Sequence, residues 1–278
     1  MTLRIRNRIM LVMFLMSALF AIFSLILFIF TFFNKSIVPP TDVLRLIDFG
    51  KSDFFLVTYN FSASVLASAL FLVYVVLTFF LMFMQFEKTQ AIEIFYFCGF
   101  LLACLCEGIK CLIPLFGLWQ TFSSRLLLLG RLVLLGKMLA PMSILLVSLF
   151  NNFEQKQDSE KNLTIAITVC AIFSLIIPIN TSMVYSSNAL SWGFSGFFFI
   201  MRALIFFVAI ISFVIKIFLI NNIASSRVIL SQIIWLSLAI FGYAVLSMAD
   251  NFLFLAIGAL FLFIPTMKFL KTTHQLYA

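Results

Sequence analysis

The feature that most constrains the fold of this chain is a series of apolar runs, each long enough to cross a lipid bilayer. An α-helix rises about 1.5 Å per residue, so about 20 apolar residues span a hydrocarbon core of about 30 Å. The sequence therefore predicts an all-α integral membrane protein, a polytopic bundle of eight transmembrane helices. The expected spans are residues 9–33, 54–86, 91–113, 126–150, 163–180, 197–220, 228–248 and 252–268.

Composition agrees with a chain that lipid covers. Hydrophobic residues make up 64% of the sequence and charged residues 10%, against about 25% charged residues in a soluble domain. The connections between spans are too short to hold a soluble domain, so residues 1–278 are expected to form a single transmembrane domain. The net charge of +8 comes from lysines and arginines scattered at span ends, which favours the lipid bilayer as partner and excludes nucleic acid.

The distribution of basic residues predicts the orientation of the bundle, because cytoplasmic loops carry an excess of lysine and arginine. With a cytoplasmic N-terminus, nine basic residues would lie inside and four outside. We therefore expect both termini in the cytoplasm, an uncleaved signal anchor at the N-terminus, and a multi-pass location in a bacterial inner (cell) membrane. The inner residues are Arg4, Arg6, Arg8, Lys88, Lys156, Lys161, Arg227, Lys268 and Lys271; the outer ones are Lys35, Arg45, Lys51 and Arg125.

Two outer segments have patterns of their own. Residues 41–50 follow a Pro-Pro pair and end at a glycine, with an apolar face between, which predicts a short interfacial helix; a disordered loop is the alternative. Residues 181–196 are rich in Ser, Thr and Asn. Tyr185 and Trp192 in this second segment are expected to anchor it at the headgroup level, with a binding loop as the alternative.

The sequence lacks the residues that most catalytic and metal sites require. His274 is the only histidine and is expected to lie outside every span, and Asp250 is the only aspartate expected near a span end in the core. No glycine-rich phosphate loop is present. Cys104, Glu107 and Cys111 share a helix face, but without a fourth ligand they are expected to serve packing. We expect no cofactor, no metal and no catalytic residue, and hence a protein that is not an enzyme.

Ionisable residues inside the spans are the informative exceptions to the apolar pattern. A charge at membrane depth costs about 2.5–3.5 kcal/mol on insertion scales, so it should face protein or water. Glu93 and Lys216 lie near the ends of their spans and are expected to reach water. The ligand-binding candidates are the other six: Glu107, Lys110, Arg131, Lys137, Arg202 and Asp250.

Five of these charges are expected to meet at one level in the outer part of the membrane. The hairpin of the third and fourth spans sets Glu107 at the depth of Arg131 and predicts an ion pair between helices. Lys110 is an i, i+3 neighbour of Glu107 on the same helix. Arg202 enters its span from the outside at a similar depth, and Asp250 sits in the outer turn between the last two spans.

Lys137 stands apart from these five. It is expected near the centre of the bilayer, about 20 Å from the cytoplasmic end of its helix. It must therefore find a partner, reach water in a cavity, or be neutral. No other residue of the chain is as hard to explain by structure alone.

The charged cluster supports a role in transport or binding of a small anionic solute or a lipid headgroup. The competing interpretation is that these charges only hold helices together. A second functional class is a sensory or assembly module that works through a separate partner chain, membrane-bound or cytoplasmic. Spans two to eight resemble seven-helix bacterial sensor domains in number and direction alone. An intramembrane enzyme using Glu107 as acid or base is a third alternative.

Overall fold

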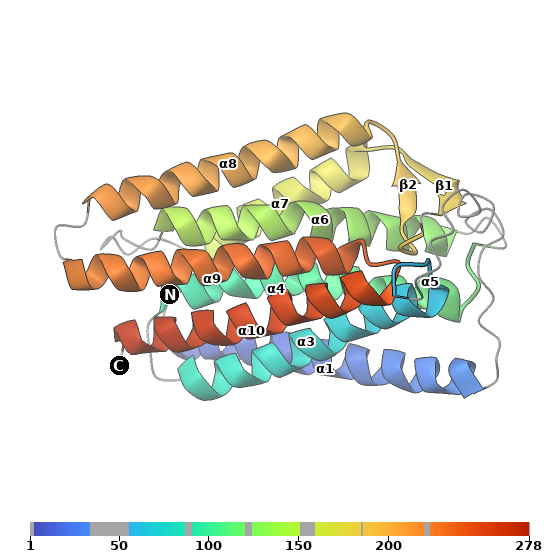
Figure 1. The fold of residues 1–278 in the computed structure, drawn as a ribbon, viewed down its shortest axis with the longest axis horizontal. Coiled ribbons are helices and arrows are strands. Elements are labelled where there is room, and N and C mark those ends of the chain that lie inside the picture. Colours follow the sequence, from blue (N-terminus) through green and yellow to red (C-terminus); the bar gives the residue numbers. More distant parts are fainter. Residues whose placement is uncertain are drawn as a thin grey trace.

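The computed structural model describes residues 3–33, 56–86, 91–119, 124–150, 159–184, 186–219 and 223–277. Eight helices in these residues are long and apolar enough to cross a membrane, which confirms an all-α bundle of membrane-spanning type. They run along one common axis (Figure 1). Residues 41–50, where an interfacial helix is predicted, lie outside the described part. The long helices are α1 (Leu3–Phe33), α3 (Phe61–Phe86), α4 (Ile92–Gly108), α6 (Ser124–Phe150), α7 (Ser159–Ile176), α8 (Ser195–Leu219), α9 (Ile223–Ser247) and α10 (Phe252–Tyr277).

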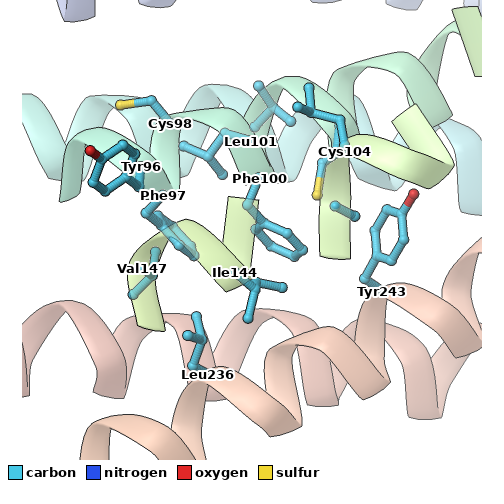
Figure 2. Packing of buried hydrophobic residues seen from close by; sticks show 14 of the residues in the cluster. Tyr96, Phe97, Cys98, Phe100, Leu101, Cys104, Ile144, Val147, Leu236 and Tyr243 are labelled. Carbon is cyan, nitrogen blue, oxygen red and sulfur yellow. The ribbon is translucent and has the colours of Figure 1, made fainter. Parts of the chain in front are cut away.

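The core lies where α4 and α6 meet α3 and the α9–α10 pair. Phe97 and Phe100 of α4 pack with Ile144 of α6, and Leu236 and Tyr243 of α9 close the cluster from the other side (Figure 2). By contrast, α1 and α8 expose many large apolar side chains. In a membrane protein such surfaces face acyl chains. Other helices therefore cover much less of α1 and α8 than of α4 and α6.

Two glycines let α9 and α10 approach backbone to backbone. A Cβ on Gly242 would lie 2.4 Å from the backbone nitrogen of Leu262, and a Cβ on Gly258 would lie 2.7 Å from that of Leu246. Small residues at such crossings allow the close packing that holds membrane helices together. The α9–α10 pair is therefore a tightly joined unit of the bundle.

Asparagine caps set the starts of two helices at the same end of the bundle. The Asn60 side-chain oxygen accepts a hydrogen bond of 3.0 Å from the backbone N–H of Ser62, and Asn251 does the same for Phe254 at 2.8 Å. The N–H of Asn60 also donates to the carbonyl of Asp250 at 2.8 Å. The second long helix, α3, thus begins at Phe61 and not at residue 54. The Asn60 cap sets the N-terminus of the helix inside the run from which the span was predicted.

The last helix extends beyond the expected span. α10 continues through its lysines to Tyr277, so His274 belongs to the last helix, and its predicted position outside the membrane-spanning part stays a prediction. The His274 ring lies 5.8 Å from that of Phe86 in an edge-on contact. Lysine and histidine do not interrupt a helix, so the end of an apolar run did not mark the end of α10.

The third span ends in a tightened turn. α4 passes into a 3₁₀ turn, η1 (Ile109–Cys111), and a short helix, α5 (Leu112–Leu115). Gly117 then adopts a left-handed conformation with φ of 56°. Its N–H donates to Pro114 and that of Leu118 to Ile113, which is the Schellman arrangement that ends a helix.

A β-hairpin occupies the place where the sequence predicts the end of the fifth span. α7 stops at Ile176, and β1 (Ile179–Val184) pairs antiparallel with β2 (Leu190–Trp192). The hairpin lies at one end of the bundle, the hairpin end, and both chain termini lie at the opposite, terminal end (Figure 1). The span predicted over 163–180 is therefore wrong at its outer end, because apolar residues there fold as a strand.

The close approach of α9 and α10 can be tested by substitution. Gly242→Val places a side chain against backbone that cannot move without separating the helices, so we expect a loss of about 2 kcal/mol in stability. Gly196→Val is the matched control, since nothing lies within 4 Å of a Cβ at Gly196. Thermal unfolding in one detergent measures both variants, and equal losses would contradict the packing.

Candidate functional site

Glu107 and Lys110 form a buried ion pair near the hairpin end. The Lys110 Nζ lies 2.6 Å from Glu107 Oε2, and the two side chains are 3% and 0% exposed. The other carboxylate oxygen accepts a hydrogen bond of 3.3 Å from the Tyr243 hydroxyl on α9. Lys110 also donates to the backbone carbonyl of Ser247 at 2.9 Å. Because Ser247 is the last residue of α9, Lys110 caps the C-terminus of that helix.

Lys137 is buried against an aromatic face. It is 4% exposed, and its Nζ lies 4.6 Å from the centre of the Trp192 ring. Among the described residues it makes no hydrogen bond or ion pair. A cation over an indole is attracted by the ring quadrupole, most strongly when water is excluded. The sequence left open what Lys137 would find, and the structure supplies the ring of Trp192.

Arg202 has a similar environment on the neighbouring helix. Its guanidinium carbon lies 5.8 Å from the centre of the Phe198 ring, and its buried Nε has no hydrogen-bond partner in the described part of the chain. Phe198 and Trp192 pack edge-on with ring centres 5.8 Å apart. Lys137 and Arg202, from different helices, therefore each make a cation–π contact with one ring of the Trp192–Phe198 pair.

These residues form an electrostatic unit, here named the buried charge cluster: Glu107, Lys110, Lys137 and Arg202. The Glu107 carboxylate is within electrostatic reach of all three cations, and Lys137 is within reach of the other two cations as well as Glu107. The cluster thus holds a surplus of positive charge. The prediction that Lys137 stands apart from the other charges is wrong, because its side chain shares their environment.

Arg131 has a different role from the one predicted. Its guanidinium donates to the carbonyls of Ser174 and Ile177, and the Ser174 hydroxyl donates to the Arg131 carbonyl at 2.6 Å. The predicted ion pair with Glu107 is wrong. Antiparallel pairing of the two spans does not predict on which face of α6 Arg131 lies. The side chain points to α7 and caps the last turn of that helix.

Asp250 also lies apart from the cluster. Its carboxylate accepts a hydrogen bond from the Ser186 hydroxyl at 3.4 Å and one from the Asn251 amide at 3.1 Å. Burial raises the pKa of Asp250 above its ordinary value, and hydrogen bonds from the backbone and from Ser186 oppose the shift. Burial, with a smaller contribution from Asp250, raises the pKa of Tyr59 to about 12.

The hairpin packs against α3 and α6 at this end of the bundle. The Asn188 amide at its tip donates to the Ser64 hydroxyl of α3 at 2.6 Å, and Asn188 is 1% exposed. Leu190, the first residue of β2 after the turn, packs against Gly130 of α6, where a Cβ would meet it at 2.6 Å. The hairpin therefore runs from α6 and α7 across to α3, with the Trp192 ring beneath it on Lys137.

Sequence reasoning missed the aromatic half of the site. Trp192 is predicted as a headgroup anchor, but its ring contacts Lys137 and Phe198. Tyr243 carries no signal in the sequence, because tyrosines inside spans are common. Glu93, expected to reach water, is 1% exposed. Among the described residues no group of histidine, cysteine, aspartate or glutamate could hold a metal ion.

The cap on α7 gives a testable difference between Arg131 and the cluster. Arg131→Met removes both bonds to the α7 carbonyls, and hydrogen bonds to charged groups contribute about 1.5–3 kcal/mol. We expect a lower unfolding temperature and faster hydrogen exchange at the start of β1. Arg125→Met, at the exposed first turn of α6, is the control and should change neither; equal exchange in the two variants would contradict the cap.

Asp250 gives the protein a pH dependence of stability. Its pKa is raised in the folded state, so the folded protein binds the proton more tightly and stability falls as pH rises from about 4, the unfolded value. Asp250→Asn should remove this fall. Ser186→Ala removes a hydrogen bond that favours the charged form of Asp250, so this variant should lose more stability as pH rises. Unfolding temperatures across pH 3–7 measure the effect (about the range over which carboxyls titrate); parallel profiles for the three proteins would contradict it.

Comparison with known proteins gives no match to any family model, any curated protein or any solved structure. The basis for a function is therefore the chemistry of the buried charge cluster and its surroundings.

Proposed function

We propose that this protein binds, and through binding transports, a small anionic solute or the anionic headgroup of a lipid at Lys137 and Arg202. One observation carries the proposal. Lys110 and Arg131 are occupied by helix ends, whereas Lys137 and Arg202 make no hydrogen bond or ion pair with any described residue. A buried cation such as Lys137, or a partly buried one such as Arg202, is free to bind an anion when it has no backbone or carboxylate partner.

The surplus of charge sets the sign of the ligand. Three cations share one carboxylate, and Glu107 is already bound by Lys110 and Tyr243. An incoming phosphate-like group would neutralise the surplus, and the planar guanidinium of Arg202 suits two-point binding of such a group. Burying an ionisable group at membrane depth costs free energy, so such a group is by default a candidate for a functional site.

The proposal also includes a location and an orientation. Both termini would lie in the cytoplasm and the hairpin end outside, in a cell membrane of the bacterial inner-membrane type. The excess of basic residues on one side supports this orientation. So does the position of both described chain ends at the terminal end (Figure 1). The cluster would then receive its ligand from the outer side.

Trp192 offers a direct measurement of binding, because its ring lies against Lys137. In a Trp119→Phe, Trp235→Phe background, Trp192 is the single remaining tryptophan. In phosphatidylcholine nanodiscs, added inorganic phosphate or incorporated phosphatidylglycerol should shift its emission. Lys137→Met should weaken the response about tenfold or more, since a hydrogen bond to a charged group contributes about 1.5–3 kcal/mol.

Matched variants separate the site from general charge effects. Lys271→Met, at the terminal end, should leave the response intact, and Arg202→Gln should weaken it while Arg125→Gln does not. No response to either probe would overturn the proposal and leave these charges with a structural role. A sensory or assembly role through a partner chain would then become the favoured function.

A further inference from the structure

A groove lined almost entirely by apolar residues lies between α8 and α9. α8 packs mainly on α6, and α9 mainly on α10, so the two helices leave a space between them with Ile144 of α6 at its floor. Its volume is about 340 Å³, within the ~300–1,000 Å³ of ligand pockets. Ile210 and Phe241 line it and are 59% and 52% exposed, so it opens sideways to the lipid.

The walls of the groove and the cluster share helix faces. On α8, Phe206, Ala209 and Phe213 follow Arg202 at i+4, i+7 and i+11, which places all four on one side of the helix. On α9, Ile240 lies one turn before Tyr243, whose hydroxyl binds Glu107. The apolar stripe of each wall therefore ends in a polar residue of the site.

The length of this stripe matches one half of a bilayer. The eleven steps from Arg202 to Phe213 rise about 16 Å along α8. The hydrocarbon core is about 30 Å thick, so one leaflet contributes about half of that. The lining of the groove on α8 begins at Phe206, one turn after Arg202. A cation followed by about 16 Å of helix with an apolar face has the dimensions of a lipid headgroup with one acyl chain.

We infer that the ligand of this site is an anionic phospholipid that enters sideways from the outer leaflet, with its phosphate at Arg202 and Lys137 and one acyl chain in the α8–α9 groove. This inference rests on the proposed function, which assigns the anion to the same two residues. A transmembrane helix of a partner would fill the groove but bring no anion to its charged end. Charge complementarity therefore favours the lipid as occupant.

The inference predicts that the chain of the ligand, and not only its headgroup, contributes to binding. With Trp192 as reporter, phosphatidylglycerol should bind at least about tenfold more tightly than glycerol phosphate, a difference of about 1.4 kcal/mol. Ala209→Phe blocks the groove and should weaken the lipid response without changing the response to glycerol phosphate. Val208→Phe adds bulk on the adjacent, lipid-facing side of α8 and should change neither.

A second measurement does not depend on blocking the groove. Phe241→Trp places a fluorophore at its mouth, and Phe207→Trp places one on α8 outside it. Phosphatidylglycerol with brominated chains should quench emission at 241 several-fold more than brominated phosphatidylcholine at equal content, and the two lipids should quench equally at 207.

The outcomes distinguish the two proposals. If glycerol phosphate binds as tightly as the lipid, and brominated lipids quench equally at both positions, the groove does not hold the chain and only the anion site remains. If neither glycerol phosphate nor phosphatidylglycerol changes Trp192 emission, the anion site fails and the lipid inference fails with it. Selective quenching at 241 without any Trp192 response would place the lipid in the groove but not at the cations, and would overturn the inference as stated.

Discussion

The structure depends on how helix ends are satisfied where water is absent. The last carbonyls of a helix have no partner within it, and in a bilayer each unpaired polar group costs several kcal/mol. α7 ends at the level of Arg131, about 10 Å along α6 from its first residue. The guanidinium of Arg131 binds the carbonyls there, and Lys110 does the same for the end of α9. The chain can then leave α7 at Ile176 and form the hairpin at this end of the bundle.

This use of cations divides the buried charges into two kinds. Lys110 and Arg131 bind the carbonyls at the ends of α9 and α7 and so stabilise helix ends. Lys137 and Arg202 stand on aromatic rings that come from the hairpin and from the start of α8. A ring stabilises a cation without using its hydrogen-bond donors. The donors of these two residues therefore remain available, which is why the binding role is assigned to them.

The sequence predicts the solvent, the number of spans and most of the buried charges, because apolar length and the cost of a charge in lipid are properties of single segments. It does not predict which charges meet. The depth of Arg131 follows from counting residues along a helical hairpin, but its direction follows from where α7 ends. The apolar residues Ile176, Ile177 and Ile179 at that point look the same as a continued helix. For the same reason Trp192 is read as a headgroup anchor: its partner, Lys137, is brought to it by a hairpin without a sequence signal of its own.

The hairpin is attached to the bundle at both of its ends. Its base follows directly from the α7 carbonyls that the Arg131 guanidinium holds, and β1 and β2 are paired there. Its tip is held by the Asn188–Ser64 bond and by the longer contact between Ser186 and Asp250. A neutral hydrogen bond contributes about 0.5–1.5 kcal/mol and a charged one about twice as much. The hairpin is thus fixed at both ends, at its base by the Arg131 guanidinium and at its tip by Asn188, Ala189 and Leu190, which are 1%, 1% and 3% exposed.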